Sequence, residues 1–381
     1  MLIQPGNREE ITNRASEERR LWHDEVQNTP SLGCERCPEK GVCGGLRIEQ
    51  SLYDCLRYCC GRPDACDRVC RERPEAFARA IREIAGFDLT NVPRAQVLPK
   101  PCIASVVPVL YHGAKRVTPF RASSVCLPLY KVIARHNGAE RYYSKAEITE
   151  KYGIREDATI LLTGTDVDAR LERWWSLSDK RLDAIRALRA LGITLVTTPN
   201  YSMFTDRPRW DDLHSMKRIA IAHEEFARGG IVAALHVNAR TDKDWDRWKK
   251  YIADRPEISH IASEFSTGAG WPTRAAWHTN KLIDLAKSVG RPLHLVMRGG
   301  SRILPILAAA FDECTFLETT VFMKTQHRQR AIVLPTGKIK WHRSPTEETQ
   351  PIDSLLNDNW KVVGSFYADL LDKTREAKKA A

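Results

Sequence analysis

Short apolar runs alternate with amphipathic helical patterns from about residue 100 to residue 320. The apolar runs cover residues 106–111, 159–163, 193–197, 231–237, 258–264, 293–297 and 315–321. The helical patterns between them cover residues 179–191, 210–228, 242–253, 273–289 and 303–311. Repeated strand–helix alternation is typical of βα units that build a parallel sheet. The pattern predicts an α/β fold of the (β/α)8 TIM-barrel type, and an open doubly wound sheet is the alternative.

The residue pattern differs on both sides of this region, and the sequence predicts four segments. Residues 1–33 read as a charged helical arm, and residues 34–100 as a small cysteine-rich metal-binding module followed by a helix. Residues 101–345 form the expected barrel domain. The segment includes a predicted hairpin with strands at 331–334 and 338–342 around Pro335-Thr336-Gly337. Residues 346–381 are expected to form a C-terminal helical tail that frays at its basic end.

Composition narrows the class of protein. Hydrophobic residues make up 43% of the 381 residues, and we find no apolar run near the roughly 18 residues of a membrane span. The polar, charged N-terminus does not resemble a secretory signal, so we expect a soluble cytoplasmic protein without a membrane partner. The net charge of +11 favours a polyanionic partner, nucleic acid first, although a solvated basic surface is the simpler alternative. Phosphate-binding glycine motifs of the GxGxxG and GxxxxGK[ST] types are missing, so nucleotide cofactors have no support.

Most of the cysteines fall in one short segment. They are Cys34, Cys37, Cys43, Cys55, Cys59, Cys60, Cys66 and Cys70, eight of the eleven in the chain. Thiolates at such spacing, opening as Cys-x2-Cys-x5-Cys, suit an iron–sulfur cluster or Zn²⁺, and the lack of histidine in the run favours the cluster slightly. A disulfide framework is the alternative, but it belongs to short secreted domains. The spacing CxxxCxxC of radical S-adenosylmethionine enzymes is absent.

Polar residues recur where the predicted strands end. In a barrel the reactive groups come from the C-terminal ends of strands and from the loops that follow. The residues at such positions are Asp166, Asp168, Asn200, Tyr201, Asn238, Arg240, Glu264, Ser266, Gly268, Arg298, Gly299, Gly300, Glu318 and Lys324. Each has a structural alternative, since Asp166 can cap a helix and Arg298 can pair with an acid. His236 reads either as a base or as a core histidine. As a set, they predict a polar substrate-binding site.

The C-terminal part of the barrel region resembles a known enzyme family. Residues 291–343 read RPLHLVMRGGSRILPILAAAFDECTFLETTVFMKTQHRQRAIVLPTGKIKWHR. This pattern is similar to that of the queuine tRNA-ribosyltransferase family and its DNA-modifying phage and bacterial relatives. Arg298-Gly299-Gly300 resembles the family's glycine turn, Glu318 the strand that bears its nucleophilic aspartate, and Lys324 its Pro-Thr-Arg region. Upstream, Asn200 lies near the family's substrate aspartate and Asn238 at its base-reading glutamine.

The resemblance implies covalent base exchange on DNA or tRNA. A carboxylate attacks the anomeric carbon of a flipped-out nucleotide, and a new base or water resolves the glycosyl–enzyme bond. It assigns Glu318 as nucleophile and Asp166 as acid or base, with asparagines reading the base and Arg240, Arg298 and Lys324 holding phosphate. The sequence departs from the family in three ways: glutamate replaces the nucleophilic aspartate, Thr198 or Asn200 replaces the substrate aspartate, and the C-terminal zinc motif is missing.

Two other functions fit the same sequence. One is a nucleic-acid-binding protein without catalysis, in which arginines of the cysteine-rich segment grip phosphates. The other is an iron–sulfur redox enzyme, in which the N-terminal cluster supplies electrons to the barrel.

Overall fold

The computed structural model describes residues 80, 82–136, 139–142, 144–203, 209–270, 272–345, 347 and 349–380. The clustered cysteines Cys34 to Cys70 and the charged arm lie outside this part of the chain, as does most of the helix predicted before residue 86. The chain divides into two compact units. The barrel unit comprises residues 94–200, 222–236 and 256–381, and the second unit comprises the described residues up to 93 with 201–221 and 237–255.

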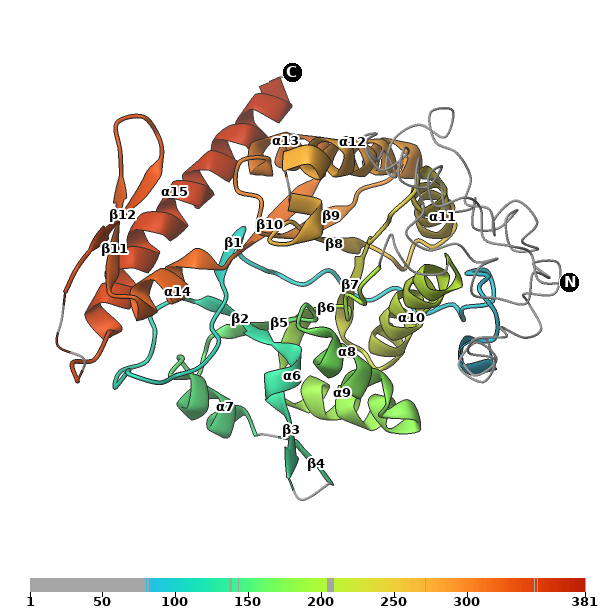
Figure 1. Cartoon of the computed structure of the whole chain (residues 1–381), viewed down its shortest axis with the longest axis horizontal. Coiled ribbons are helices and arrows are strands. Elements are labelled where there is room, and N and C mark those ends of the chain that lie inside the picture. The colour runs from blue at the N-terminus through green and yellow to red at the C-terminus, as the bar shows by residue number, and fades with distance from the viewer. Residues whose placement is uncertain are drawn as a thin grey trace, which may run out of the picture. The chain divides into compact units, whose positions relative to one another are not determined.

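Eight parallel strands form the barrel unit. They are β1 (Val106–Pro108), β2 (Ser124–Pro128), β5 (Thr159–Thr163), β6 (Ile193–Thr197), β7 (Val232–His236), β8 (His260–Glu264), β9 (His294–Arg298) and β10 (Glu313–Glu318). Their spatial order follows the sequence, with β10 beside β1. An isolated parallel bridge joins Val109 to Cys126, and the Leu110 N–H donates to the Cys126 carbonyl at 2.9 Å. The sheet is therefore a nearly closed parallel barrel (Figure 1), which confirms the predicted barrel type.

Helices follow most of the strands. In the barrel unit these are α6 (Leu129–Val132), α7 (Lys145–Tyr152), α8 (Asp168–Trp175), α9 (Arg181–Ala190), α12 (Pro272–Val289), α13 (Leu304–Ala310), α14 (Thr320–Gln326) and α15 (Asp353–Ala380), with 3-10 turns at Ser178–Lys180 and Gly268–Gly270. Helix α10 (Arg209–Arg228) contributes residues to both units, and α11 (Asp242–Ala253) belongs to the second unit. The second unit therefore takes most of its described residues from the segments that follow β6 and β7.

Helix starts are explained by local sequence. Thr241 begins α11 with a capping box, because its hydroxyl accepts from the Asp244 N–H and the Asp244 carboxylate accepts from the Thr241 N–H. Ser144 and Glu147 do the same for α7. At the other end, Gly153 adopts the left-handed conformation that closes α7.

Two antiparallel hairpins accompany the barrel. The predicted C-terminal hairpin is confirmed, as β11 (Gln329–Val333) pairs with β12 (Ile339–Arg343). A second hairpin, β3 (Ile133–His136) with β4 (Ala139–Tyr142), had no sequence prediction. Strand β2 was not predicted either, because prolines and polar residues surround its short apolar run. The expected tail is a long helix, α15, whose Asn359 is buried and whose Tyr367 ring lies 4.8 Å from that of Phe316 in β10.

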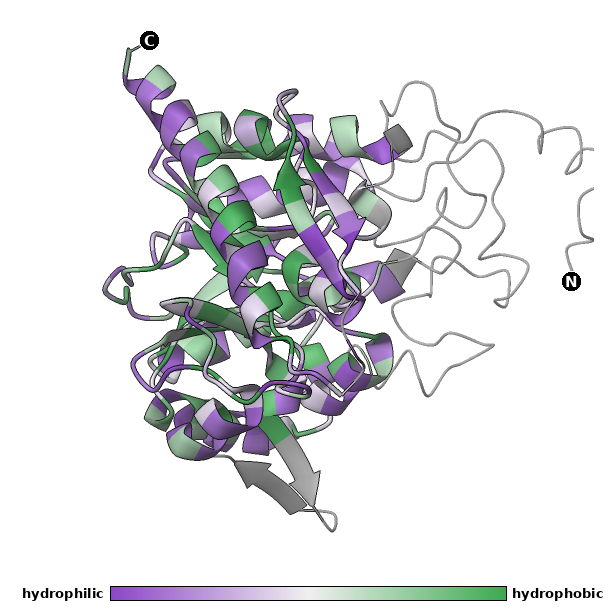
Figure 2. Ribbon diagram, turned by 90° about the vertical axis from the view of Figure 1, so that its left-hand side faces the viewer, coloured by the Kyte–Doolittle hydropathy of each residue, from purple (hydrophilic) through white to green (hydrophobic). Residues whose placement is uncertain are grey.

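One apolar layer of side chains fills the middle of the barrel interior. Its fully buried members are Val107, Val109, Cys126, Leu161, Leu195, Ala234, Ala262, Val296 and Leu317, so every strand or its extension contributes. Figure 2 shows hydrophobic and hydrophilic residues alternating along the helices, and the buried core residues include many from the barrel strands. Among the described residues, no helix combines the length and apolarity needed to cross a membrane.

Candidate active site at the C-terminal end of the barrel

A polar layer lies directly above the apolar layer, toward the C-terminal ends of the strands. Side chains along a strand alternate between its two faces, so residues two positions beyond an interior residue also face the interior. Applied to the apolar layer, this rule gives Thr163, Thr197, His236, Glu264 and Arg298. Tyr111 follows Val109 in the same way. This is the end at which barrel enzymes place their chemistry.

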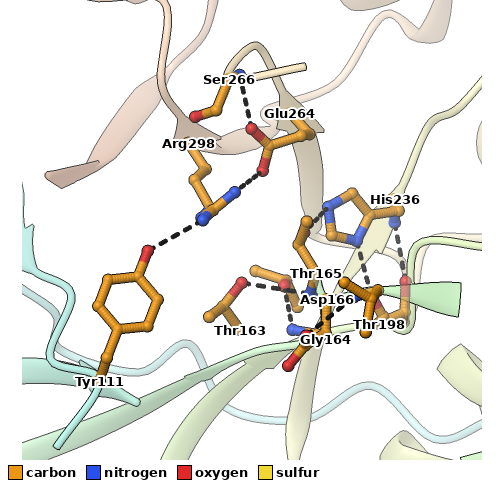
Figure 3. Close-up of polar contacts among 12 residues, drawn as sticks. Tyr111, Thr163, Gly164, Thr165, Asp166, Thr198, His236, Glu264, Ser266 and Arg298 are labelled. Atoms are coloured by element: carbon orange, nitrogen blue, oxygen red, sulfur yellow. Dashed lines mark hydrogen bonds and ion pairs between the residues drawn. The ribbon is translucent and has the colours of Figure 1, made fainter. Parts of the chain in front are cut away.

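Glu264 and Arg298 form a buried ion pair in this layer. Arg298 Nη1 lies 2.5 Å from Glu264 Oε2, and the two side chains are 15% and 3% exposed. The second carboxylate oxygen accepts from the Ser266 N–H at 2.6 Å, and Arg298 Nη2 donates to the Tyr111 hydroxyl oxygen at 3.1 Å (Figure 3). Among the described residues, buried Arg298 Nε has no hydrogen-bond partner. One guanidinium donor beside the fixed carboxylate is thus left without a hydrogen bond in this part of the chain.

The electrostatics keep this arginine charged. Burial alone lowers the pKa of Arg298, but the Glu264 carboxylate and the Tyr111 hydroxyl outweigh it, and the net pKa lies above the ordinary value. Removing two charges from water is costly, and hydrophobic residues of similar volume often replace such pairs without loss of stability. A buried ion pair at this end of a barrel is therefore a reason to expect function there.

A glycine turn at the end of β9 packs against the loop that follows β8. Gly299 and Gly300 have φ angles of +72° and +71°, which residues with side chains rarely adopt. A Cβ on Gly299 would lie 2.3 Å from Ser266 Oγ. The Phe265 N–H donates to the Arg298 carbonyl at 2.7 Å, so loop and turn meet through their backbones. This close approach positions the Ser266 N–H against Glu264.

His236 enters the same layer as a neutral imidazole. Burial lowers its pKa to about 4; the hydrogen bond with Thr198 opposes this change and the Arg298 charge adds to it. His236 Nδ1 donates to the Thr198 carbonyl at 2.6 Å, which fixes the tautomer. Nε2 therefore carries a lone pair, and it faces the Thr165 hydroxyl at 3.4 Å (Figure 3). At neutral pH the imidazole is therefore unprotonated, and its Nε2 can accept a hydrogen bond.

Charged groups border the polar layer near β2 and β5. Both Asp166 oxygens lie 2.9 Å from Arg170 Nη1 in α8, and one accepts from the Val167 N–H, but the capping of α8 predicted for Asp166 is not formed, because Val167 is the N-cap residue and no side chain caps the helix. Lys131, in the helix after β2, donates to the Tyr111 carbonyl at 3.0 Å. Burial lowers the pKa of Lys131 and the Arg170 charge lowers it further, against Asp166. An anion would relieve this excess of positive charge.

The sequence prediction missed Lys131 because it missed β2. The signal was present, since Ser124-Val125-Cys126-Leu127-Pro128 is a short apolar run and the lysine follows it by three residues. Tyr111 was treated as the end of a strand rather than as a site residue.

Glu318 lies on the other face of its strand. Leu317 belongs to the interior layer, so the next residue points outward toward the helices. One Glu318 oxygen accepts from the Thr320 N–H at 2.8 Å and from the Thr320 hydroxyl, and the other accepts from the Val321 N–H at 2.8 Å. Burial raises the pKa of Glu318, against these hydrogen bonds. The carboxylate caps α14, and its role as nucleophile stays a prediction that this geometry disfavours.

Three predicted site residues belong to the second unit and contact one another there. Asn238 Nδ2 donates to the Tyr201 carbonyl at 3.2 Å, and Arg240 donates to the Met203 carbonyl at 2.9 Å and to Asn238 Oδ1 at 3.2 Å. Tyr201 is buried, with the Arg218 guanidinium 3.9 Å from its ring centre. These side chains hold the segment 201–203, and the Tyr201 ring is already covered.

The remaining predictions fall at separate places. The Asn200 N–H donates to the Gly164 carbonyl at 3.2 Å, Asp168 is the exposed first residue of α8, Gly268 opens a 3-10 turn, and Lys324 lies on α14. Among the described residues no group of three or more His, Cys, Asp or Glu is placed to hold a metal ion, and Cys102, Cys126 and Cys314 are free thiols. The metal prediction for Cys34 to Cys70 lies outside this part of the chain.

The polar layer therefore contains a fixed carboxylate, a guanidinium, a phenol and a neutral imidazole. Comparison with known proteins adds no identity, because no protein-family model and no curated protein matches the chain.

Proposed function

We propose that this protein is an enzyme that breaks and re-forms the glycosidic bond of a nucleotide in a nucleic acid, exchanging or removing its base at the C-terminal end of the barrel. The observation that carries the proposal is the buried Glu264–Arg298 pair, held by Tyr111 and by the Ser266 N–H. The net charge of +11 and the resemblance to base-exchange enzymes supply the substrate class.

In this proposal Glu264, rather than Glu318, is the catalytic carboxylate. It attacks the anomeric carbon, forming a carbon–oxygen bond as the carbon–nitrogen bond breaks, and the departing base leaves with the bonding electron pair and takes a proton from solvent. A fixed negative charge stabilises the oxocarbenium character of the transition state. Arg298 and Ser266 hold the carboxylate in one orientation, so that little reorganisation is needed during the reaction.

His236 acts in the second step. Its Nε2 lone pair accepts the proton of the incoming base or water, whose nitrogen or oxygen displaces the carboxylate from the anomeric carbon. Lys131 and Arg298 are the groups that favour a phosphorylated substrate, because both are cationic and lie at the polar layer.

The test compares two isosteric substitutions. Purified full-length protein and its Glu264→Gln and Glu318→Gln variants are incubated with bulk tRNA and with double-stranded DNA. Released bases and exchanged nucleosides are then measured by mass spectrometry. We expect Glu264→Gln to lower turnover by about 10²–10³-fold while nucleic-acid affinity stays within a factor of about two. Glu318→Gln should keep turnover, because that carboxylate faces away from the interior.

Two results would overturn the proposal. Loss of turnover in Glu318→Gln with normal turnover in Glu264→Gln would return the nucleophile to the residue that the sequence indicated. A wild-type protein that binds nucleic acid but neither releases nor exchanges a base would support the binding-protein alternative.

A metal-binding role for Cys34 to Cys70 remains a separate proposal. It rests on the number and spacing of the cysteines alone. Anaerobic purification with elemental analysis distinguishes an iron–sulfur cluster, which is coloured, from colourless zinc, and the finding of neither would reject the module.

A further inference from the structure

The segment between the last barrel strand and the C-terminal helix is strongly basic. Between Glu318 and Glu347 the sequence contains no acidic residue. It contains the cations Lys324, Arg328, Arg330, Lys338, Lys340 and Arg343. Elsewhere lysine and arginine are mixed with acids, with 59 basic against 48 acidic residues in the whole chain. Four of these six cations lie in the β11–β12 ribbon, whereas Lys324 lies on α14 and Arg328 just before β11.

The ribbon has one covered face and one open face. Ala331 and Trp341 pair across the strands on the covered face, where Ala331 is buried and its N–H donates to Asn359 Oδ1 of α15 at 2.8 Å. Figure 1 shows the ribbon beside α15, outside the barrel strands. The neighbouring pairs, Arg330 with His342 and Ile332 with Lys340, lie on the open face because side chains alternate along a strand.

The open face presents cations with little internal compensation. Arg330 makes an exposed ion pair with Asp358 at 3.2 Å, which contributes little. Within the described residues, Lys338 and Lys340 have no carboxylate partner, and both are exposed. Ile332 is 43% exposed between them, so the face also offers apolar contact. A surface of this kind fits a polyanion that has apolar edges between its charges.

We propose that the open face of the β11–β12 ribbon binds double-stranded DNA, with Lys338 and Lys340 on phosphates. The major groove of B-form DNA is about 12 Å wide and admits a two-stranded ribbon, whereas the deep, narrow major groove of A-form RNA does not. The ribbon is antiparallel and two-stranded, and the side chains of its open face are exposed within the described part of the chain, which matches that groove. This inference rests on the proposed function for its substrate class and selects DNA over RNA within it.

The experiment measures the salt dependence of binding by fluorescence anisotropy. The wild-type full chain, a Lys338→Gln/Lys340→Gln variant and a Lys373→Gln/Lys379→Gln control are titrated with a labelled DNA duplex and with a labelled folded tRNA. The control removes the same charge from exposed positions of α15. Each lost phosphate contact lowers the slope of log K against log salt by about 0.9, so we expect the ribbon variant to lose about 1.8 on duplex DNA. The control should lose less than about 0.5.

Equal slopes for ribbon variant and control would overturn the ribbon as the contact surface. A loss confined to tRNA would overturn DNA as its partner. The salt slopes on DNA and tRNA do not depend on catalysis. A protein that releases no base, but whose ribbon variant loses slope on DNA, would contradict the proposed function and support this inference. Unchanged melting temperatures establish that both variants are folded, as expected for exposed positions.

Discussion

The two ends of the barrel are built from the same strands but carry different kinds of polar group. At the C-terminal end, His236 lies with the buried Glu264–Arg298 pair. At the N-terminal end, His260 and His294 stack with their ring centres 4.7 Å apart, and His294 Nδ1 lies 3.3 Å from Glu313. Glu313 pairs in turn with Lys100 at 2.6 Å, but the two side chains are 43% and 52% exposed.

Buried histidines therefore occur at both ends of the barrel, whereas the buried ion pair lies at the C-terminal end. Burial lowers the pKa of His260 to about 3 and of His294 to about 4, as it does for His236. The His294 charge adds to the effect on His260, and Glu313 opposes it on His294. Depressed histidine pKa values follow from burial in any core, while a buried ion pair needs a particular arrangement that stability alone does not favour.

The largest expected difference between the ends concerns stability after one partner of each ion pair is removed. Arg298→Leu leaves the Glu264 carboxylate buried and unpaired, so we expect the free energy of unfolding to fall by about 3–5 kcal/mol in urea denaturation. Lys100→Gln at the other end should cost less than about 1 kcal/mol, because that pair is exposed. The Glu264→Leu/Arg298→Leu double variant should recover most of the loss. Similar losses in the free energy of unfolding for the two single variants would show that the two ion pairs are energetically alike.

Acid sensitivity is the next effect, and both ends should share it. The folded-state pKa values of His236, His260 and His294 lie below the unfolded value near 6.5. The contribution of the neutral histidines to the free energy of unfolding is therefore fully present above pH 6.5 and is lost as pH falls toward 4. We expect each histidine to account for about 1–2 kcal/mol of the stability lost between pH 6.5 and pH 5. Replacing any one of them with glutamine should flatten the pH dependence of the urea midpoint.

Activity should separate the same three histidines. Only His236→Gln is expected to lower turnover, since only its Nε2 belongs to the polar layer. A matching loss of turnover in His260→Gln at unchanged stability would show that the N-terminal end takes part in the chemistry.

The smallest effect concerns Glu318, which belongs to neither interior layer. Because it accepts from two backbone N–H groups in the first turn of α14, Glu318→Ala should cost about 0.5–2 kcal/mol, the ordinary range for a helix cap. Glu318→Gln should cost less, since it keeps an acceptor. Thermal unfolding of both variants measures this, and a cost above 4 kcal/mol would show that the carboxylate does more than cap the helix.

Part of the candidate site was accessible from the sequence. Glu264, Ser266, Arg298, Gly299 and Gly300 were all expected near the ends of strands, and the structure brings them together. The expectation succeeded because long apolar strands have recognisable ends. It was incomplete for Lys131, which follows the unpredicted strand β2, and for Tyr111, which lies just beyond β1.

Glu318 shows the limit of such reasoning. A strand end can be located to within one residue, but one residue exchanges the interior face for the exterior face. Asn238 and Arg240 show a second limit. They directly follow β7 in the sequence, yet their side chains hold the segment 201–203 of the second unit.

The sequence by itself determined the alternation of strands and helices, and with it the barrel, because hydrophobic periodicity is a local property of the chain. It also determined the cysteine cluster and the acid-free basic segment that became the β11–β12 ribbon. Only the tertiary structure decided which face of each strand points inward, since that depends on the register among eight strands as the barrel closes. That register pairs Glu264 with Arg298 across 34 residues, and places Tyr111 and Lys131 beside them.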